Sequence, residues 1–98
     1  MNRPIVLRAA AKLDLASAYD YYEGERIGLG AEFMARVKRC LGEIAANPEW
    51  HAVVEADIRQ ALVTRFPYGI FYRVHSDRIE IVAVLHHKRD PHIWKRRM

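Results

Sequence analysis

The chain has 98 residues, 51% of them hydrophobic and 29% charged, so we expect one folded domain spanning residues 1–98 rather than a disordered chain. Cys40 is the only cysteine, which excludes a disulfide bond within the chain, and no apolar run approaches the ~18 residues of a membrane span. Because the single cysteine suits a reducing compartment and no signal peptide is recognisable, we expect a cytoplasmic protein that does not associate with membranes.

The first half of the chain predicts one short strand followed by two helices. Residues 5–7 are an apolar run long enough for a strand, and residues 9–26 then switch to helical spacing. Beyond Gly28 and Gly30, residues 31–46 carry a wide apolar stripe at helical spacing, formed by Phe33, Val37, Cys40, Leu41 and Ile44. Asn47-Pro48 ends the second helix, and the short connection between the helices predicts an antiparallel hairpin.

The second half of the chain predicts a sheet and a terminal helical turn. From residue 58 the apolar period changes to two, which indicates strands over residues 58–66, 68–75 and 78–86. Asp90-Pro91 then has the residue types of a helix N-cap and first helical position. We therefore predict an α+β fold of order β-α-α-β-β-β, with the helical hairpin packed on one face of a small, mainly antiparallel sheet and a short C-terminal helical turn.

The net positive charge lies entirely in the last thirteen residues. Residues 1–85 contain eleven Lys or Arg and eleven Asp or Glu, which cancel, whereas residues 86–98 contain five Lys or Arg against Asp90 alone. Such a basic end attracts phosphates or acidic segments. A solvated, solubilising end is the alternative interpretation.

The predicted strands carry basic and aromatic side chains that suit nucleic-acid chemistry. Strand alternation places three sets of residues each on one face: Arg59, Ala61, Val63 and Arg65; Gly69, Phe71, Arg73 and His75; and Glu80, Val82, Val84 and His86. Because the hairpin covers only one face, we expect the open face to carry arginines, tyrosines and His86. Such a face could bind RNA or cleave it, with Arg65, Arg73 and His86 as catalytic candidates. Alternatively, these arginines pair with acidic side chains or bind an antagonist peptide.

Other kinds of active site find no support in the sequence. There is no Gly-rich phosphate loop and no serine elbow, and His86, His87 and His92 lack the spacing of a zinc site. We therefore predict neither a metal nor a cofactor, and these residues leave open whether the protein is an enzyme.

Three phrases of the second half resemble a known family. They are Arg65-Phe-Pro-Tyr-Gly-Ile-Phe-Tyr-Arg-Val74, Asp77-Arg-Ile-Glu-Ile81 and His86-His-Lys-Arg-Asp-Pro-His-Ile-Trp94. Together they resemble the RelE/ParE superfamily of bacterial type II toxins. The spacing H-x-x-R-x-P-x-x-W, read at His86, Arg89, Pro91 and Trp94, is similar to the end of the ParE-like branch.

This resemblance implies a toxin that arrests growth and stabilises plasmids, and that forms a hetero-oligomer with a cognate antitoxin whose C-terminal segment wraps it. The implied target is DNA gyrase, or alternatively the ribosome and its mRNA if the protein is a RelE-like endoribonuclease. A third possibility is a non-toxic binding module with the same fold. We predict that eight residues contact the antitoxin or the target: Arg59, Tyr68, Tyr72, Lys88, Arg89, Trp94, Arg96 and Arg97. For Trp94, packing of the terminal turn against the sheet is the alternative.

Overall fold

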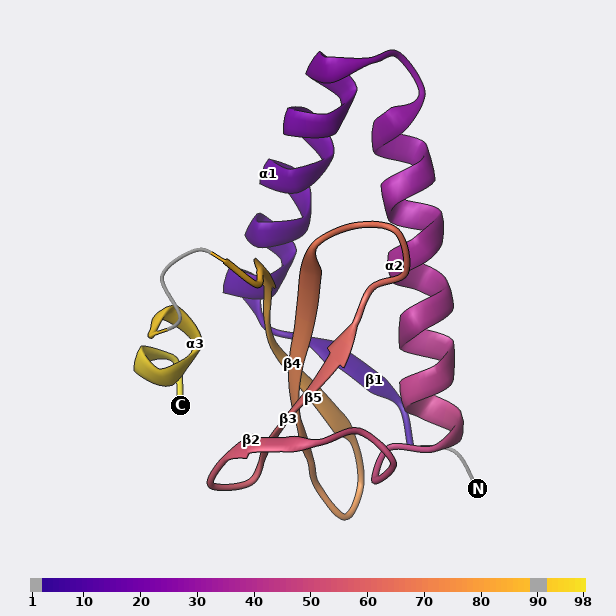
Figure 1. The fold of residues 1–98 in the computed structure, drawn as a ribbon. Helices are drawn as coiled ribbons and strands as arrows, with labels where there is room; N and C mark the ends of the chain where they lie inside the picture. The colour runs from indigo at the N-terminus through magenta and orange to yellow at the C-terminus, as the bar shows by residue number, and fades with distance from the viewer. Residues whose placement is uncertain (1–2, 89–91) are drawn as a thin grey trace.

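The computed structural model describes residues 3–88 and 92–98, which form a helical hairpin, a five-stranded sheet and a short C-terminal helix (Figure 1). The elements in chain order are β1 (Ile5–Leu7), α1 (Ala9–Glu25), α2 (Leu29–Ala46), β2 (Val53–Glu55), β3 (Ile58–Leu62), β4 (Tyr68–Val74), β5 (Ile79–His86) and α3 (Ile93–Arg96). The predicted α+β fold is confirmed, with one strand more than expected, β2. The predicted helix cap at Asp90-Pro91 lies outside the described residues.

The helical hairpin forms because each helix buries a row of apolar side chains and a tight turn joins them. In α2 the buried side chains include Phe33, Val37, Cys40 and Ile44, four of the five predicted stripe positions. Gly28 adopts a positive φ of 91° between the helices, a conformation that glycine reaches without strain. The Glu23 carboxylate accepts hydrogen bonds from the backbone N–H of Gly28 at 2.9 Å and of Gly30 at 3.0 Å, which fixes the turn.

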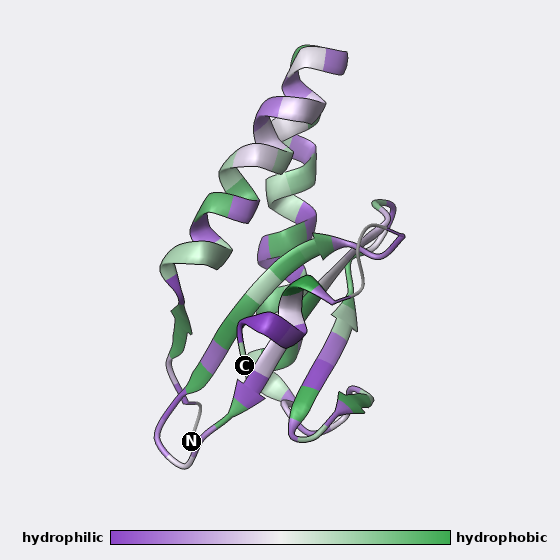
Figure 2. Cartoon of the chain, turned by 90° about the vertical axis from the view of Figure 1, so that its left-hand side faces the viewer, coloured by the Kyte–Doolittle hydropathy of each residue, from purple (hydrophilic) through white to green (hydrophobic). Residues whose placement is uncertain are grey.

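The sheet has the strand order β1-β5-β4-β3-β2, with β1 parallel to β5 and every other pair antiparallel. The hairpin covers one face, and the main core lies between them, with Phe33, Ile44, Ile70 and Tyr72 fully enclosed. Figure 2 shows hydrophobic residues predominating along the long strands, whereas α3 is mostly hydrophilic. Within the described residues, no helix is long and apolar enough to cross a membrane.

A β-bulge changes which residues share a face of the sheet. Phe71 pairs with Ala83 but the next residue of β4, Tyr72, pairs with Ile81, so Val82 is an extra residue in β5. Val84 consequently belongs to the core under the helices, whereas Val82 lies in a second cluster on the other face. The prediction that Glu80, Val82, Val84 and His86 share one face is therefore wrong.

Two other predicted placements are also wrong. Tyr68 and Tyr72 were expected on the open face, but both side chains are buried in the core under the helices. The third strand ends at Leu62 rather than at residue 66, because the chain turns before Pro67. Arg65 therefore lies in the β3–β4 turn with a positive φ of 72° and not on a strand face with Arg59.

Candidate functional site at the C-terminal end and the open sheet face

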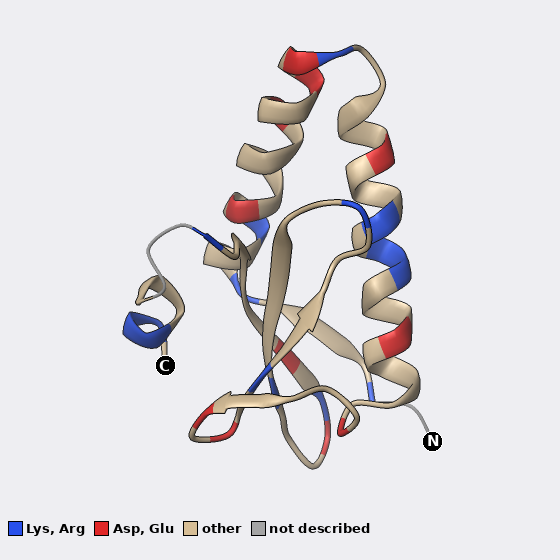
Figure 3. Cartoon of the chain, viewed as in Figure 1, with Lys and Arg blue, Asp and Glu red and all other residues tan. Residues whose placement is uncertain are grey.

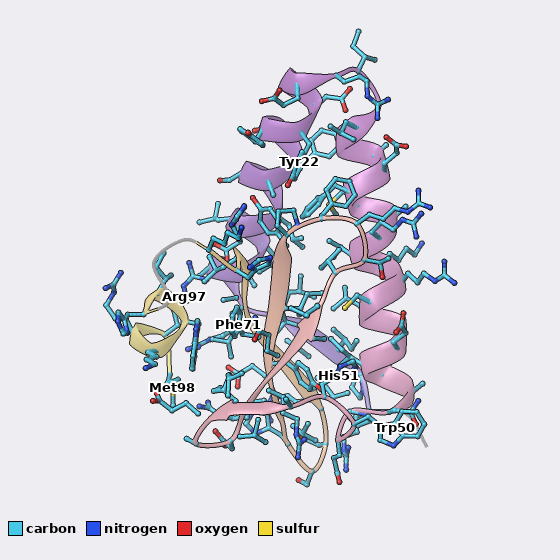
Figure 4. The ribbon with its side chains drawn as sticks, in the orientation of Figure 1. Tyr22, Trp50, His51, Phe71, Arg97 and Met98 are labelled. Carbon is cyan, nitrogen blue, oxygen red and sulfur yellow. The ribbon has the colours of Figure 1, made fainter. Side chains whose placement is uncertain are left out.

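The C-terminal helix α3 covers an apolar patch on the sheet face that the hairpin leaves open. Trp94 is only 7% exposed and stacks on Phe71, with ring centroids 5.1 Å apart and ring planes 14° from parallel. Ile58, Val82 and Ala83 complete this second cluster. Stacked aromatic rings and buried apolar area hold the terminal turn against the sheet, and Figure 4 shows Phe71 facing the C-terminal segment.

An ion pair between the two ends of the chain fixes this segment further. Arg97 donates from Nη1 to Asp14 Oδ2 at 2.6 Å and from Nη2 to Oδ1 at 3.0 Å, a bidentate geometry. Asp14 Oδ2 also accepts the backbone N–H of Val84 at 2.9 Å. β1 pairs with β5 only as far as Ile81, so the backbone groups of β5 beyond Ile81 have no partner in β1. The Asp14–Arg97 pair supplies hydrogen-bond partners there. The hydrogen bonds to Asp14 raise the pKa of Arg97, so this charge is permanent.

A charged cluster lies beside α3 on the same open face. Glu80 accepts a hydrogen bond from His75 Nε2 at 2.8 Å and lies 3.2 Å from Arg8 Nε and 3.7 Å from Arg73 Nη1. The hydrogen bond from His75, with the nearby Arg8 and Arg73 charges, lowers the pKa of Glu80 although partial burial opposes this. Arg73 also pairs with Asp57 at 3.0 Å. These arginines are therefore paired with acids, which is the alternative that the sequence left open.

Fewer cationic side chains of the C-terminal end are exposed than its net charge suggests. Lys95 pairs with Glu55 at 3.4 Å and lies 5.7 Å from the centre of the Trp94 ring. Lys88 and Arg96 have exposed side chains, whereas Arg89 lies outside the described residues. The end is thus an anchored helical turn that presents Lys88 and Arg96 to solvent.

Comparison with known proteins identifies the family. The model of the family described as ParE toxin of type II toxin-antitoxin system, parDE, matches residues 5–91. The chain belongs to the ParE toxin family. A solved structure described as the chromosomal ParDE TA system from P. aeruginosa has the same fold, with a TM-score of 0.76 and 16% identity over 86% of this chain and 95% of that chain. The search of curated proteins found no match.

The three catalytic candidates of this ParE family member do not converge. Arg73 is opposite Glu80 in the sheet, whereas His86 is opposite Tyr68, six residues further along β5 and about 20 Å away. His86 packs its ring 5.5 Å from that of Tyr68, and its Nδ1 accepts the backbone N–H of Lys88 at 3.1 Å. Arg65 lies in the β3–β4 turn, which contacts the end of β5 through the bond from His87 N–H to the Pro67 carbonyl.

Two further predicted contact residues of the toxin-family chain hold the loop after α2. Arg59 Nη1 donates to the carbonyl oxygens of Glu49 at 2.9 Å and His51 at 2.7 Å. The Tyr72 hydroxyl donates to the Pro48 carbonyl at 2.6 Å, and burial raises the pKa of Tyr72 to about 12. Both side chains therefore hold the loop between α2 and β2 in place and do not form a binding surface.

The structure also shows a feature that the sequence reasoning missed. Arg36 and Arg39 of α2 line a hollow of about 460 Å³ together with Arg65 of the β3–β4 turn. The available signal was the spacing of Arg36 and Arg39, three residues apart on the polar side of a predicted helix. In residues 3–88 and 92–98, no three His, Cys, Asp or Glu side chains are grouped so that they could hold a metal ion.

Proposed function

We propose that this protein is a toxin that inhibits DNA gyrase and that a cognate antitoxin neutralises it. The observation that carries the proposal is the match of the ParE toxin family model over residues 5–91, nearly the whole chain. The structure of similar fold comes from a ParDE toxin–antitoxin system, which supports the pairing with an antitoxin.

The positions of the catalytic candidates on the sheet favour binding over RNA cleavage, because Arg73 lies on the open face whereas His86 packs on Tyr68 on the face that the helices cover. General acid–base cleavage needs a proton acceptor and a proton donor within hydrogen-bond reach of one phosphodiester. Arg73 and His86 are about 20 Å apart along the sheet, and His75 is bonded directly to Glu80. The alternative of ribosome-dependent mRNA cleavage has no specific support here, and it is an outcome of the experiment below.

The helical hairpin offers a docking place for the antitoxin. Two adjoining hollows of about 510 and 470 Å³ lie along α1 and α2 and share Leu15 and Met34 in their walls. Lys12 borders one and Lys38 the other. An amphipathic antitoxin segment with acidic flanks would place apolar side chains against Leu15 and Met34 and carboxylates near the lysines.

Induced expression in bacteria tests the target directly. We expect growth arrest accompanied by loss of DNA supercoiling, with protein synthesis intact at the same early time, and we expect purified protein to trap cleaved DNA on gyrase. Early loss of protein synthesis with cleaved mRNA and normal supercoiling would instead establish the nuclease alternative. Normal growth with a folded, expressed protein would establish the non-toxic module.

Point variants test whether the exposed basic end contacts the target. Deletion of the tail is unsuitable because it removes Trp94 and Arg97, which anchor the fold. The double variant K88A/R96A removes two exposed cations, and R78A, which removes one cation in the turn between β4 and β5, shows the effect of losing a charge away from that end. We expect K88A/R96A to inhibit gyrase at least ~10-fold more weakly than R78A; equal inhibition by both would place the contact elsewhere.

A further inference from the structure

A groove on the helical side of the molecule is lined by four arginines: Arg26, which pairs with Glu32, and three more that come from α2 and the β3–β4 turn. These three are Arg36 and Arg39 of α2 and Arg65 of the β3–β4 turn, and Leu29, Ala35 and Phe66 form the apolar part of the lining. The hollow has a volume of about 460 Å³. Figure 3 shows the cationic residues of α2 and of this turn next to each other, on the opposite side of the molecule from α3. We call these three residues the arginine groove.

The arginine groove has no acidic partner within the part of the chain that the structure describes. The side chains of Arg36, Arg39 and Arg65 make no hydrogen bond or ion pair there, and the one acid in the wall, Glu32, pairs with Arg26 at 2.8 Å. By contrast, Arg8, Arg73 and Arg97 each pair with a carboxylate. Arg39 and Arg65 are exposed and Arg36 is partly buried, so all three cations are accessible to an anion, whose binding would offset their mutual repulsion.

The backbone at Arg65 supports a binding role for this side chain. Arg65 has φ of 72°, a left-handed conformation that costs a residue with a side chain about 1–2 kcal/mol. The turn around it is fixed by bonds from Val63 N–H to the Tyr68 carbonyl at 2.9 Å and from Tyr68 N–H to the Phe66 carbonyl at 2.7 Å. Strain of this kind concentrates at functional positions, and here it accompanies the side chain that closes the groove.

We propose that Arg36, Arg39 and Arg65 bind successive phosphates of a nucleic-acid backbone. The planar fork of each guanidinium matches two phosphate oxygens. Side chains three residues apart on a helix have Cβ atoms about 5–6 Å apart, a spacing at which Arg36 and Arg39 reach two neighbouring phosphates of one strand. A polymer with a negative charge on every unit satisfies all three arginines at once, whereas a peptide has to supply several acidic side chains in register. The site is independent of the gyrase contact proposed above.

The experiment measures binding of purified full-length protein to a fluorescein-labelled DNA duplex as a function of salt concentration, without gyrase. We expect the triple variant R36Q/R39Q/R65Q to bind at least ~10-fold more weakly in low salt, and the slope of log K against log salt to fall by about 3. The matched control R36Q/R39Q/R78Q removes the same number of charges but keeps Arg65. It changes Arg78 instead, which pairs with Asp77 far from the groove. This control should retain more DNA affinity than R36Q/R39Q/R65Q, and its slope of log K against log salt should fall by about 2. Circular dichroism and the thermal midpoint check that both variants are folded.

Three results would overturn the proposal. These are an unchanged salt slope in the triple variant, equal losses in the triple variant and its control, and loss of binding to a labelled oligoglutamate peptide with DNA binding intact. The last result would assign the groove to an acidic protein segment. Because no gyrase is present, failure here is distinguishable from failure of gyrase inhibition.

Discussion

The protein has two basic regions that differ in how their cationic side chains are paired within the fold. The C-terminal end contains the whole sequence excess of +4, yet Arg97 pairs with Asp14, Lys95 pairs with Glu55, and α3 packs on the sheet. The arginine groove comes from the stretch in which acidic and basic residues cancel, yet its three arginines have no acidic partner among the described residues. A local excess of charge along a sequence therefore does not locate the charge that is available for binding.

The difference arises because the fold brings acids from distant segments to one region and not to the other. Asp14, in α1, and Glu55, in β2, are far from the C-terminal end in sequence but contact it in space. Glu32, the acid in the wall of the arginine groove, pairs with Arg26. Ion pairing depends on tertiary neighbours within about 4 Å, which a count along the chain cannot show.

Removing the aromatic anchor of the C-terminal end should have the largest effect on stability. We expect Trp94→Ala to lower the free energy of unfolding by about 3 kcal/mol, because it removes a buried ring that stacks on Phe71. Trp50, which is 81% exposed, supplies the control: Trp50→Ala should change stability by less than about 0.5 kcal/mol. Urea unfolding followed by circular dichroism measures both, and equal effects would show that α3 is not anchored through Trp94.

Breaking the ion pair between the chain ends should have the next largest effect. We expect Arg97→Gln to destabilise the protein by about 2 kcal/mol, because it leaves Asp14, which is 11% exposed, without its charged partner. A double-mutant cycle with Asp14→Asn isolates the coupling between the two side chains. A coupling energy near zero would mean that the Asp14–Arg97 pair does not stabilise the tail.

The Glu80 cluster predicts a dependence on pH. The pKa of Glu80 is lowered from its usual 4.5, so its contribution to stability is present above pH 4.5 and is lost as the pH falls through the lower, folded value. At pH 7 we expect Glu80→Gln to cost about 1 kcal/mol, with the difference from the unmodified protein shrinking in strong acid. Unfolding curves at pH 7, 5 and 3 measure this. A difference that stays constant to pH 3 would contradict the assigned role of the carboxylate.

The smallest expected effect concerns backbone strain in the arginine groove. Arg65→Gly should stabilise the protein by about 0.5–1 kcal/mol, because glycine adopts a positive φ without the cost that arginine bears. Ala56, with φ of 50°, gives the matched control. Ala56→Gly should stabilise similarly and leave DNA affinity unchanged, whereas Arg65→Gly should weaken DNA binding. Destabilisation by Arg65→Gly would show that its side chain supports the fold.

The sequence predicted those parts of the fold that depend on local pattern. The apolar stripe of α2 and the long strands β4 and β5 follow from periodicity, because burial on one face imposes it. The strand β2 escaped prediction because its three residues, Val53 to Glu55, are all exposed and show no buried face. The bulge at Val82 also has no signature in the local pattern. It places Val84 and His86 on the opposite face of the sheet from Glu80 and Val82.

The candidate site was less predictable because it depends on contacts between distant residues. The family resemblance pointed to the C-terminal phrase, and Trp94 does anchor it, but Asp14 and Arg97 are 83 positions apart. The arginine groove joins residues of α2 to a turn that was expected to be part of a strand. Only the tertiary structure shows which arginines are paired and which are not.

The most direct test of this comparison measures the free energy of unfolding and DNA affinity side by side in R97Q and R39Q. Both variants remove one positive charge. We predict that R97Q loses about 2 kcal/mol of stability and keeps most of its DNA affinity, whereas R39Q unfolds like the unmodified protein and binds DNA with a salt slope reduced by about 1. The reverse pattern, with DNA binding lost in R97Q and stability lost in R39Q, would contradict the account.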